Sequence, residues 1–208
     1  VVLNTGAPCE MPWNDQVDAI LQCWFPGQEF GNSLADIIFG DVNPSGKLPT
    51  TFPVKLEDTP AYSTYPGKDL QMDYQEGLYI GYRWYEKEKI VPLYPFGHGL
   101  SYTTFDYSNV RAIPPKGTSS VAAFELEITN TGSTEGKEVI QCYSSVQNSK
   151  VDRPLKELKK FQKINLDPGE SKKITFEVNE RDLSYWNEET KTWQVEPAQY
   201  IFKFGSSS

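Results

Sequence analysis

The segment from Val91 to Phe105 constrains the fold most, because the pattern of the chain changes across it. Before this segment, short apolar runs and helical spacings alternate, which predicts α/β structure. After it, apolar and polar residues alternate in short stretches, which predicts β structure alone. Within it Pro95 fixes φ, and Gly97 and Gly99 flank the chain's single histidine, His98. We therefore expect a structural hinge at Gly97, His98 and Gly99.

The hinge segment is aromatic as well as rich in proline and glycine. Tyr94, Phe96, Tyr102 and Phe105 all lie within it. Since this much apolar surface is unstable in water, a free linker is excluded. The hinge is expected to be packed against folded structure.

Residues 1–60 follow the order of a doubly wound, mostly parallel sheet. Residues 1–5 predict a buried strand, 19–25 a second buried strand and 28–39 a helix that Gly40 ends. Asn14 is the expected N-cap of a short helical segment between the two strands. Sixty residues are too few for a complete domain of this class, so we expect the C-terminal part of an α/β sandwich domain. The chain also opens inside a strand with no initiator methionine, which predicts that it is a piece of a longer protein.

Residues 61–105 are expected to form a linker that wraps and joins the domains. Just before them, the loop from Gly40 to Lys47 has a superficial likeness to a phosphate-binding loop. Its glycines have the wrong spacing, and Leu48 stands where such a loop needs Ser or Thr, so a nucleotide site is excluded. Residues 48–53 predict a short edge strand, because Pro49 and Pro53 cannot donate to a ladder.

Residues 106–208 predict an all-β sandwich of the fibronectin type III kind. Short strands with one apolar face recur at regular spacing, separated by turn signals such as Asp167-Pro168-Gly169. The expected strands cover residues 123–129, 138–144, 155–166, 174–178 and 200–204, with a hairpin between Trp186 and Trp193.

Composition removes several classes of partner. The net charge is −8 and the pI is about 4.8, which argues against nucleic acid and against anionic membranes. The basic cluster from Lys156 to Lys163 has acidic neighbours and is expected to be a solvated face. No run approaches the roughly 18 apolar residues that a membrane helix needs.

The cysteine pattern excludes a disulfide framework and a metal site. Cys9, Cys23 and Cys142 are odd in number and lack C-x-x-C spacing, and one histidine is too few for zinc. The sequence also has no Asn-x-Ser/Thr acceptor. Both features favour a cytoplasmic protein over a secreted one.

Two carboxylates deserve weighing as ligand-binding residues. Glu10 and Glu29 each follow the predicted end of a strand, at the rim where open α/β sheets bind ligands. The ordinary alternative, caps and loop hydrogen bonds, is favoured for both. Cys9 shares this rim but has no base beside it in the sequence, so we expect a small buried side chain.

His98 and the two hairpin tryptophans each allow a functional and a structural interpretation. Without a nucleophile motif near it, His98 is expected to be a structural donor rather than a catalyst. Trp186 and Trp193 could form a sugar-stacking platform, but a cross-strand aromatic pair that covers the sandwich is favoured.

Several motifs, taken in order, span nearly the whole chain. They are Val1–Gly6 (VVLNTG), Trp24–Asn32 (WFPGQEFGN), Leu34–Asp36, Phe39–Pro49 (FGDVNPSGKLP), Glu76–Gly77, Gly81–Arg83, Pro95–Thr103 (PFGHGLSYT), Arg153–Lys159 (RPLKELK) and Leu166–Glu170 (LDPGE). Together they resemble the C-terminal portion of a glycoside hydrolase family 3 β-glucosidase. The resemblance implies an N-terminal barrel, then an α/β sandwich domain, then a fibronectin type III-like domain.

The resemblance also implies that the catalytic residues lie outside this chain. In the family, the aspartate nucleophile lies in the barrel, and the acid/base glutamate lies on a loop of the α/β domain before the strand that opens this chain. A retaining glycosidase needs both carboxylates about 5 Å apart. Glu10 and Glu29 do not match the family's acid/base motif, so we expect no catalytic residue here and an inactive fragment.

The function implied by the resemblance is that of a brace. The chain would support the α/β domain that carries the acid/base loop, in an enzyme that removes terminal β-D-glucosyl residues with no metal or cofactor. Its partners would be the N-terminal barrel and the remainder of the α/β domain, and the β-glucoside substrate in the intact enzyme. The alternatives are a carbohydrate- or protein-binding β-sandwich module without hydrolase activity, and one half of a nicked enzyme.

Overall fold

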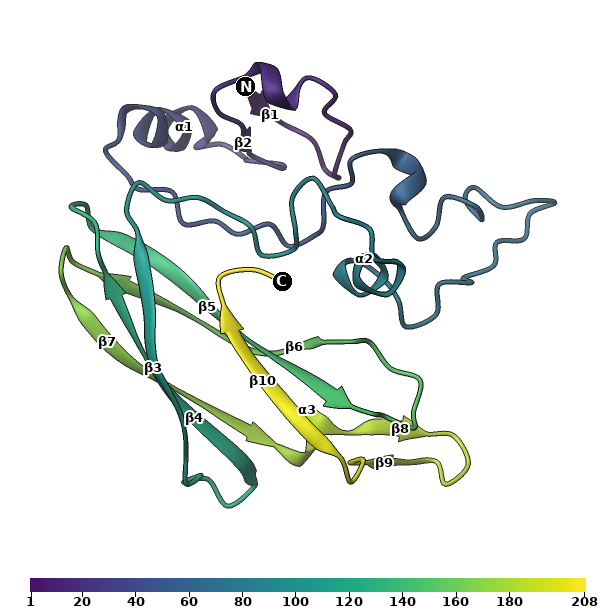
Figure 1. Ribbon diagram of the computed structural model, residues 1–208. Coiled ribbons are helices and arrows are strands. Elements are labelled where there is room, and N and C mark those ends of the chain that lie inside the picture. Colours follow the sequence, from purple (N-terminus) through teal and green to yellow (C-terminus); the bar gives the residue numbers. More distant parts are fainter. The chain divides into compact units, whose positions relative to one another are not determined.

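The computed structural model describes residues 1–208 and divides them into two compact units (Figure 1). The N-terminal unit comprises Val1–Val42, Gly46–Gly99 and Ser207–Ser208. The sandwich unit comprises Asn43–Ser45 and Leu100–Ser206. No helix in the chain has the length and apolar character needed to cross a membrane. The α/β part followed by a fibronectin-like sandwich confirms the expected fold class.

The N-terminal unit begins with a small parallel sheet. Strands β1 (Val2–Leu3) and β2 (Leu21–Gln22) pair in parallel, as the doubly wound pattern predicts. Both strands are shorter than expected, and the prediction that they are buried is wrong. Val1 and Val2 are exposed, and Leu21 and Gln22 of β2 are only partly buried. Parallel strands are buried where both faces of their sheet are covered. Within residues 1–208 this sheet has only two strands, which is too small a sheet to bury either of them.

Two helical segments accompany this sheet. The 3₁₀ helix η1 spans Asn14–Gln16, and its N-cap is Trp13, so the prediction that Asn14 is the cap is wrong. The N–H of Asn14 already donates to the carbonyl of Met11 (2.9 Å), inside the turn. Helix α1 (Phe30–Phe39) ends as predicted at Gly40, whose φ of 84° is left-handed.

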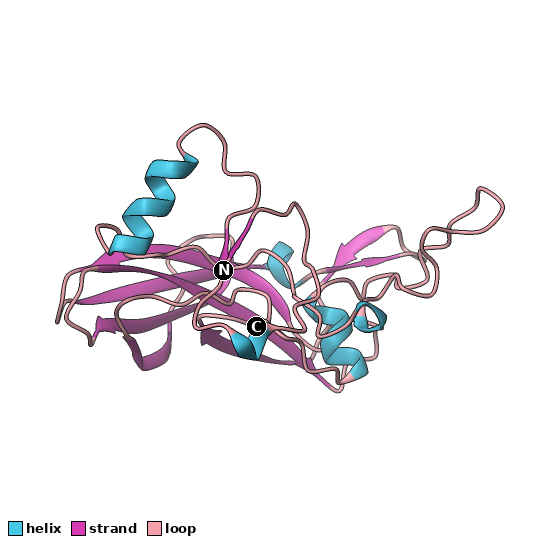
Figure 2. Cartoon of the chain, turned by 90° about the horizontal axis from the view of Figure 1, so that it is seen from above, coloured by secondary structure: helices cyan, strands magenta, loops and turns pink.

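The rest of the N-terminal unit contains little regular structure. A 3₁₀ helix η2 (Leu56–Asp58) and helix α2 (Tyr82–Glu88) enclose a long excursion over residues 59–80 (Figure 1, Figure 2). The predicted edge strand over residues 48–53 is reduced to one antiparallel bridge, between Phe52 and Tyr94. Residues 61–99 belong to this unit, whereas the expected linker covered residues 61–105.

The sandwich unit consists of two antiparallel three-stranded sheets. One has the order β3-β4-β7 and the other β10-β5-β6. The strands are β3 (Phe105–Ile113), β4 (Ser120–Asn130), β5 (Gly136–Gln147), β6 (Glu157–Leu166), β7 (Ser171–Asn179) and β10 (Gln199–Gly205). A short helix α3 (Glu180–Leu183) leads into the hairpin of β8 (Tyr185–Asn187) and β9 (Thr192–Gln194).

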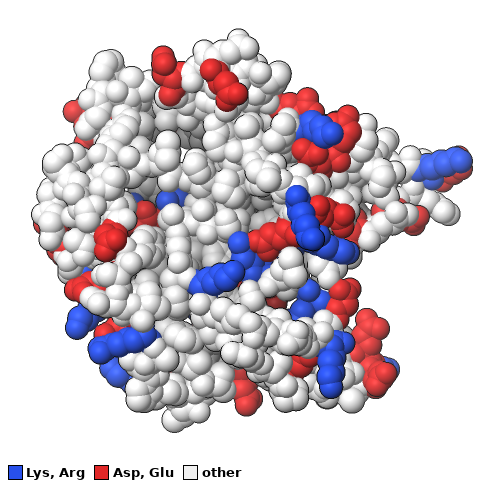
Figure 3. Space-filling model, in the orientation of Figure 1, with Lys and Arg blue, Asp and Glu red and all other residues white.

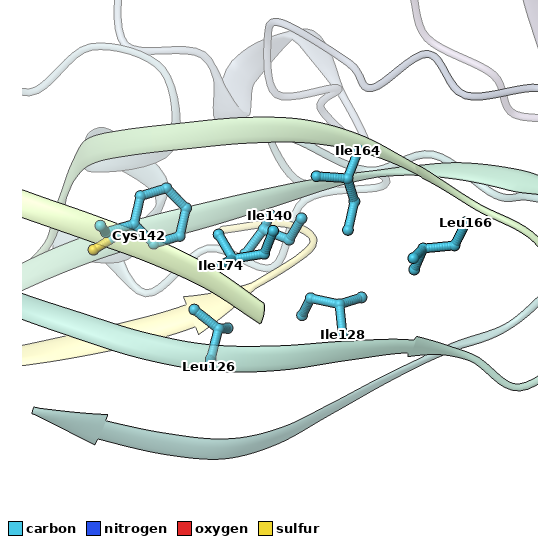
Figure 4. Packing of buried hydrophobic residues seen from close by; sticks show 8 residues of the cluster. Leu126, Ile128, Ile140, Cys142, Ile164, Leu166 and Ile174 are labelled. Carbon is cyan, nitrogen blue, oxygen red and sulfur yellow. The ribbon is translucent and has the colours of Figure 1, made fainter. Parts of the chain in front are cut away.

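The core of the sandwich lies between these sheets (Figure 4). Alternate side chains of β4 point inward, and Leu126 and Ile128 are fully buried, as their alternation predicts. Ile140 and Cys142 of β5 meet them from the opposite sheet. Burial raises the pKa of the Cys142 thiol to about 12, so Cys142 behaves as a small apolar residue.

A three-residue segment from early in the chain completes the sandwich unit. The side-chain oxygen of Asn43 accepts from the hydroxyl of Ser101 (2.9 Å) and from the N–H of Tyr102 (2.8 Å). Its amide nitrogen donates to the carbonyl of Glu135 (2.9 Å), and Lys163 donates to the hydroxyl of Ser45 (2.8 Å). These contacts fix residues 43–45 against the loops of the sandwich unit.

Candidate functional site

The hinge around His98 is held to Lys47 and Leu48 by hydrogen bonds within the N-terminal unit. The N–H of Gly97 donates to the carbonyl of Leu48 (2.7 Å), and the N–H of Leu48 donates to the carbonyl of His98 (2.8 Å). The ammonium of Lys47 donates to the carbonyl of Gly99 (3.0 Å). Hydrogen bonds of this kind leave the segment little freedom, and the hinge is packed as the aromatic composition predicts.

Steric requirements explain why both hinge positions are glycine. Gly97 has a φ of +83°, a conformation that residues with a side chain rarely adopt. A Cβ at Gly99 would lie 2.2 Å from the carbonyl oxygen of Gly46. The two backbone segments therefore approach each other more closely than any side chain allows.

The imidazole of His98 is part of an aromatic stack. It packs on the ring of Tyr94 with 4.9 Å between centroids and 27° between planes. The hydroxyl of Tyr94 donates to Asn14 (2.6 Å), and its ring meets Phe52 edge-on at 6.4 Å. Phe52 in turn meets Trp24 at 6.1 Å. The stack thus joins four segments of the N-terminal unit that are distant in the sequence.

The electrostatics of His98 favour a neutral ring. Burial lowers the pKa of His98, and the charge of Lys47 lowers it further. No carboxylate forms an ion pair with the ring, although a histidine base commonly relies on such a partner for orientation. The packing and the neutral ring favour a structural role for His98 over a catalytic one.

We expect the substitution His98→Ala to reduce stability more than it reduces the turnover of the intact enzyme that the resemblance implies. Loss of the stack on Tyr94 removes about 1 kcal/mol or more. Thermal unfolding and steady-state kinetics of the same preparation measure the two effects. A large fall in turnover with an unchanged melting curve would instead assign His98 to catalysis.

The two rim carboxylates hold loops. Glu10 is exposed, and its carboxylate accepts from the N–H of Leu56 (2.5 Å) at the start of η2. Glu29 is exposed beside the first turn of α1, and its carboxylate accepts from the side chain of Asn32 (2.7 Å). These are the cap and loop hydrogen bonds expected of carboxylates that bind no ligand, and the two residues share no hydrogen-bonding partner. Cys9 is half-buried.

The hairpin tryptophans form the expected cross-strand pair. Trp186 and Trp193 face each other in the register of β8 and β9, edge to face, with 5.5 Å between centroids. The guanidinium of Arg181 lies 3.3 Å from the centre of the Trp193 ring. Since Arg181 and Trp186 both pack against Trp193, its ring is a poor platform for a sugar.

Sequence reasoning missed an ion cluster in the sandwich unit. The side chain of Arg153 is 7% exposed and lies 3.4 Å from Glu157 and 3.7 Å from Glu196. Lys159, also nearly buried, lies 3.2 Å from Glu157. The expectation of a solvated basic face is therefore wrong for Lys159, because acidic neighbours neutralise it inside the fold. The available signal was the single acidic residue, Glu157, among Arg153, Lys156 and Lys159.

A pocket in the N-terminal unit was also missed. It has a volume of about 270 Å³ and is lined by Thr51, by Tyr82, Tyr85 and Glu86 of α2, and by residues 89–92 among others. The hydroxyl of Thr51 is buried without a hydrogen-bond partner. Burial, with the charge of Asp58, raises the pKa of Tyr85 to about 12, so this residue is a neutral phenol at ordinary pH. No group of three or more His, Cys, Asp or Glu side chains in residues 1–208 is placed to hold a metal ion.

Comparison with known proteins places this architecture in a family. Residues 1–102 match the glycosyl hydrolase family 3 C-terminal domain, and residues 138–208 match the fibronectin type III-like domain. The chain is 47% identical to a thermostable β-glucosidase B of Acetivibrio thermocellus, over 100% of the chain and 28% of the relative.

Solved structures agree with the sequence relatives. A β-glucosidase of Kluyveromyces marxianus in complex with glucose matches with a TM-score of 0.92 and 42% identity, over 100% of the chain and 25% of that protein. β-glucosidase 3B of Thermotoga neapolitana in complex with α-D-glucose matches with a TM-score of 0.91 and 42% identity, over 100% of the chain and 29% of that protein. The chain thus spans about a quarter of the length of the relatives it matches. It belongs to glycoside hydrolase family 3 and corresponds to the C-terminal region of that family's β-glucosidases, as its motifs indicate.

Proposed function

We propose that the chain is the non-catalytic C-terminal portion of a retaining β-glucosidase that hydrolyses terminal β-D-glucosyl residues. The observation that carries this proposal is the match of both family domains to the chain, in order, together with its similarity over 100% of its length to β-glucosidases. The relatives are larger single chains of which this region is the last part. The proposed partners are accordingly the N-terminal barrel and the remainder of the α/β domain of the same enzyme.

The proposed role is to brace the α/β domain that carries the acid/base loop. Retaining hydrolysis needs a nucleophile and an acid/base about 5 Å apart, and small displacements of either are costly. The hinge is suited to bracing because its backbone hydrogen bonds and aromatic stack hold it rigidly within the N-terminal unit. We retain the prediction that residues 61–105 link domains 1–60 and 106–208 in the whole enzyme.

We do not propose the alternative of a binding module without hydrolase activity. Its best support, the exposed tryptophan pair, is explained by cross-strand packing and by Arg181. The solvent-facing side of Trp186 alone is a small surface for a polysaccharide.

We expect residues 1–208 alone to release no glucose from p-nitrophenyl β-D-glucoside above background, because they supply neither carboxylate. The enzyme encoded by the complete gene should hydrolyse it, with β-D-glucose as the first product by NMR. Activity of residues 1–208 alone would contradict the non-catalytic assignment. Inactivity of the folded complete enzyme on β-glucosides would contradict the proposed function itself.

A further inference from the structure

We propose that residues 59–80 form a docking arm whose apolar tip packs against the part of the enzyme outside residues 1–208. This inference rests on the proposed function, since it requires the longer polypeptide. It assigns the arm a role in holding the N-terminal unit to its remaining partner domains.

The arm exposes an unusual amount of apolar surface. Its outgoing and returning segments are irregular and extend together away from α2 (Figure 1, Figure 2). Leu70 at its tip is completely exposed, and Tyr65 and Tyr74 are 72% and 75% exposed. Tyr62, Leu78 and Ile80 along the arm are also exposed. A single exposed apolar side chain is ordinary, but a concentration of this kind marks an interaction surface.

The tip has a specific conformation. Lys68 and Gln71 exchange two backbone hydrogen bonds of 2.8 and 2.9 Å, which closes a two-residue hairpin turn. The turn residues Asp69 and Leu70 both have positive φ, 52° and 62°, as a type I′ turn requires. Gly67 makes this turn possible, since a Cβ there would lie 2.3 Å from the carbonyl oxygen of Gln71.

Leucine is a poor residue for this turn position. Asn or Gly adopts positive φ easily, whereas a branched apolar side chain does so at a cost. Within residues 1–208 the side chain of Leu70 gains no burial to offset that cost. A strained apolar residue held out to solvent is explained if another surface covers it.

The base of the arm is anchored, so the tip is presented from a fixed point. The indole N–H of Trp84 donates to the carbonyl of Asp58 (3.1 Å) at one end. At the other end Tyr79 is buried, and the ammonium of Lys87 lies 3.7 Å from the centre of its ring. Between them, the N–H of Tyr65 donates to the carbonyl of Ala61 (2.8 Å) and starts the outward path.

The size of the tip favours a partner in the same polypeptide over a second copy. A stable interface between separate proteins buries about 800 Å² on each side, which is more than one hairpin tip supplies. A covalently linked partner avoids most of the entropic cost of association, so a small contact is enough. The relatives supply such a partner, because about three quarters of their length lies outside the matched region. Lys68 and Asp69 are adjacent in the sequence and have opposite charges, so the tip has no single sign, which disfavours a polyanion. Figure 3 shows positive and negative side chains on the same face of the molecule.

The substitution Leu70→Asn tests the proposal in the complete enzyme. Asn adopts positive φ more easily than Leu, so the melting temperature should stay the same or rise if the tip is free. If the tip is docked, the lost apolar contact should lower the melting temperature by about 2 °C or more. The matched control Leu70→Met keeps the apolar surface and should leave the melting temperature unchanged.

Hydrogen exchange of the complete enzyme gives a second measurement. Amides of residues 65–74 should exchange about tenfold more slowly, or slower still, in the wild-type enzyme than in the Leu70→Asn variant. Equal exchange in the two proteins, or a melting temperature that Leu70→Asn leaves unchanged or raises, would overturn the docking arm. Protection or stability that rises with protein concentration would assign the tip to a second copy and also overturn it. Loss of the proposed β-glucosidase function would appear separately, as inactivity of the complete wild-type enzyme.

Discussion

The substitution Gly99→Ala is expected to destabilise the N-terminal unit by about 3 kcal/mol, because it forces two packed backbone segments apart. The new Cβ would lie 2.2 Å from the carbonyl oxygen of Gly46, which cannot move as a flexible side chain does. Separation of the two segments would also weaken the hydrogen bonds of Leu48 with Gly97 and His98. Urea unfolding monitored by tryptophan fluorescence measures the loss.

The opposing glycine provides the matched control. A Cβ added at Gly46 meets nothing within 4 Å. Gly46→Ala is therefore expected to change stability little, although it adds the same methyl group to the same pair of segments. Equal losses in the two variants would show that the close approach at Gly99 is not what requires glycine.

The substitution Glu196→Gln is expected to cost the sandwich unit about 3 kcal/mol, because it leaves a buried guanidinium without its full complement of charge. Glu196 is 8% exposed. Its carboxylate accepts from the N–H of Lys150 (2.6 Å) and from the hydroxyl of Ser149 (2.7 Å), and it lies 3.7 Å from Arg153. The side-chain amide of Gln carries an NH₂ group in place of one oxygen, so one of the groups that donate to Glu196 would lose its acceptor. Thermal unfolding of the sandwich transition measures the effect.

The carboxylate of Glu196 should also make the stability of the sandwich unit depend on pH. The N–H of Lys150, then the hydroxyl of Ser149, hold the pKa of Glu196 below its ordinary value, and Arg153 contributes further. The stabilisation is therefore present above the unfolded-state pKa of about 4.3 and is lost as the pH falls through the lower folded-state pKa. Glu196→Gln should flatten this part of the acid-unfolding profile. Glu125→Gln, in the exposed pair of Arg111 and Glu125, is the control and should have a much smaller effect at neutral pH.

The sandwich was predictable because its signals are local. Alternation over 123–129 places Leu126 and Ile128 on one face, and both are fully buried in β4. The signal Asp167-Pro168-Gly169 ends β6 and precedes β7 as expected. In each case the period of a strand, or the backbone preference of a turn residue, acts within a few positions. The cross-strand pairing of Trp186 and Trp193 follows from the same short range.

The irregular part of the N-terminal unit was predictable only in outline. Helix α2 at Tyr82–Glu88 lies within residues 61–105, for which the sequence predicted a linker and specified no helix. Most of the arm over residues 59–80 likewise lies within the expected linker, for which the sequence predicted no particular conformation. Its tip depends on the fit of Gly67 against Gln71, which no periodicity encodes.

By itself, the sequence determined the order of an α/β part and an all-β sandwich, the aromatic hinge between the two patterns, and, through its motifs, the family. Only the tertiary structure decided which polar residues and which glycines make the stabilising contacts. Asn43 donates to Glu135 and Glu196 accepts from Lys150, across 92 and 46 positions of the chain. Gly99 lies against the backbone of Gly46, 53 positions away. Hydrogen bonds and steric contacts act over a few ångströms in space. A residue whose partner is distant in the chain therefore shows its role only once the backbone has folded.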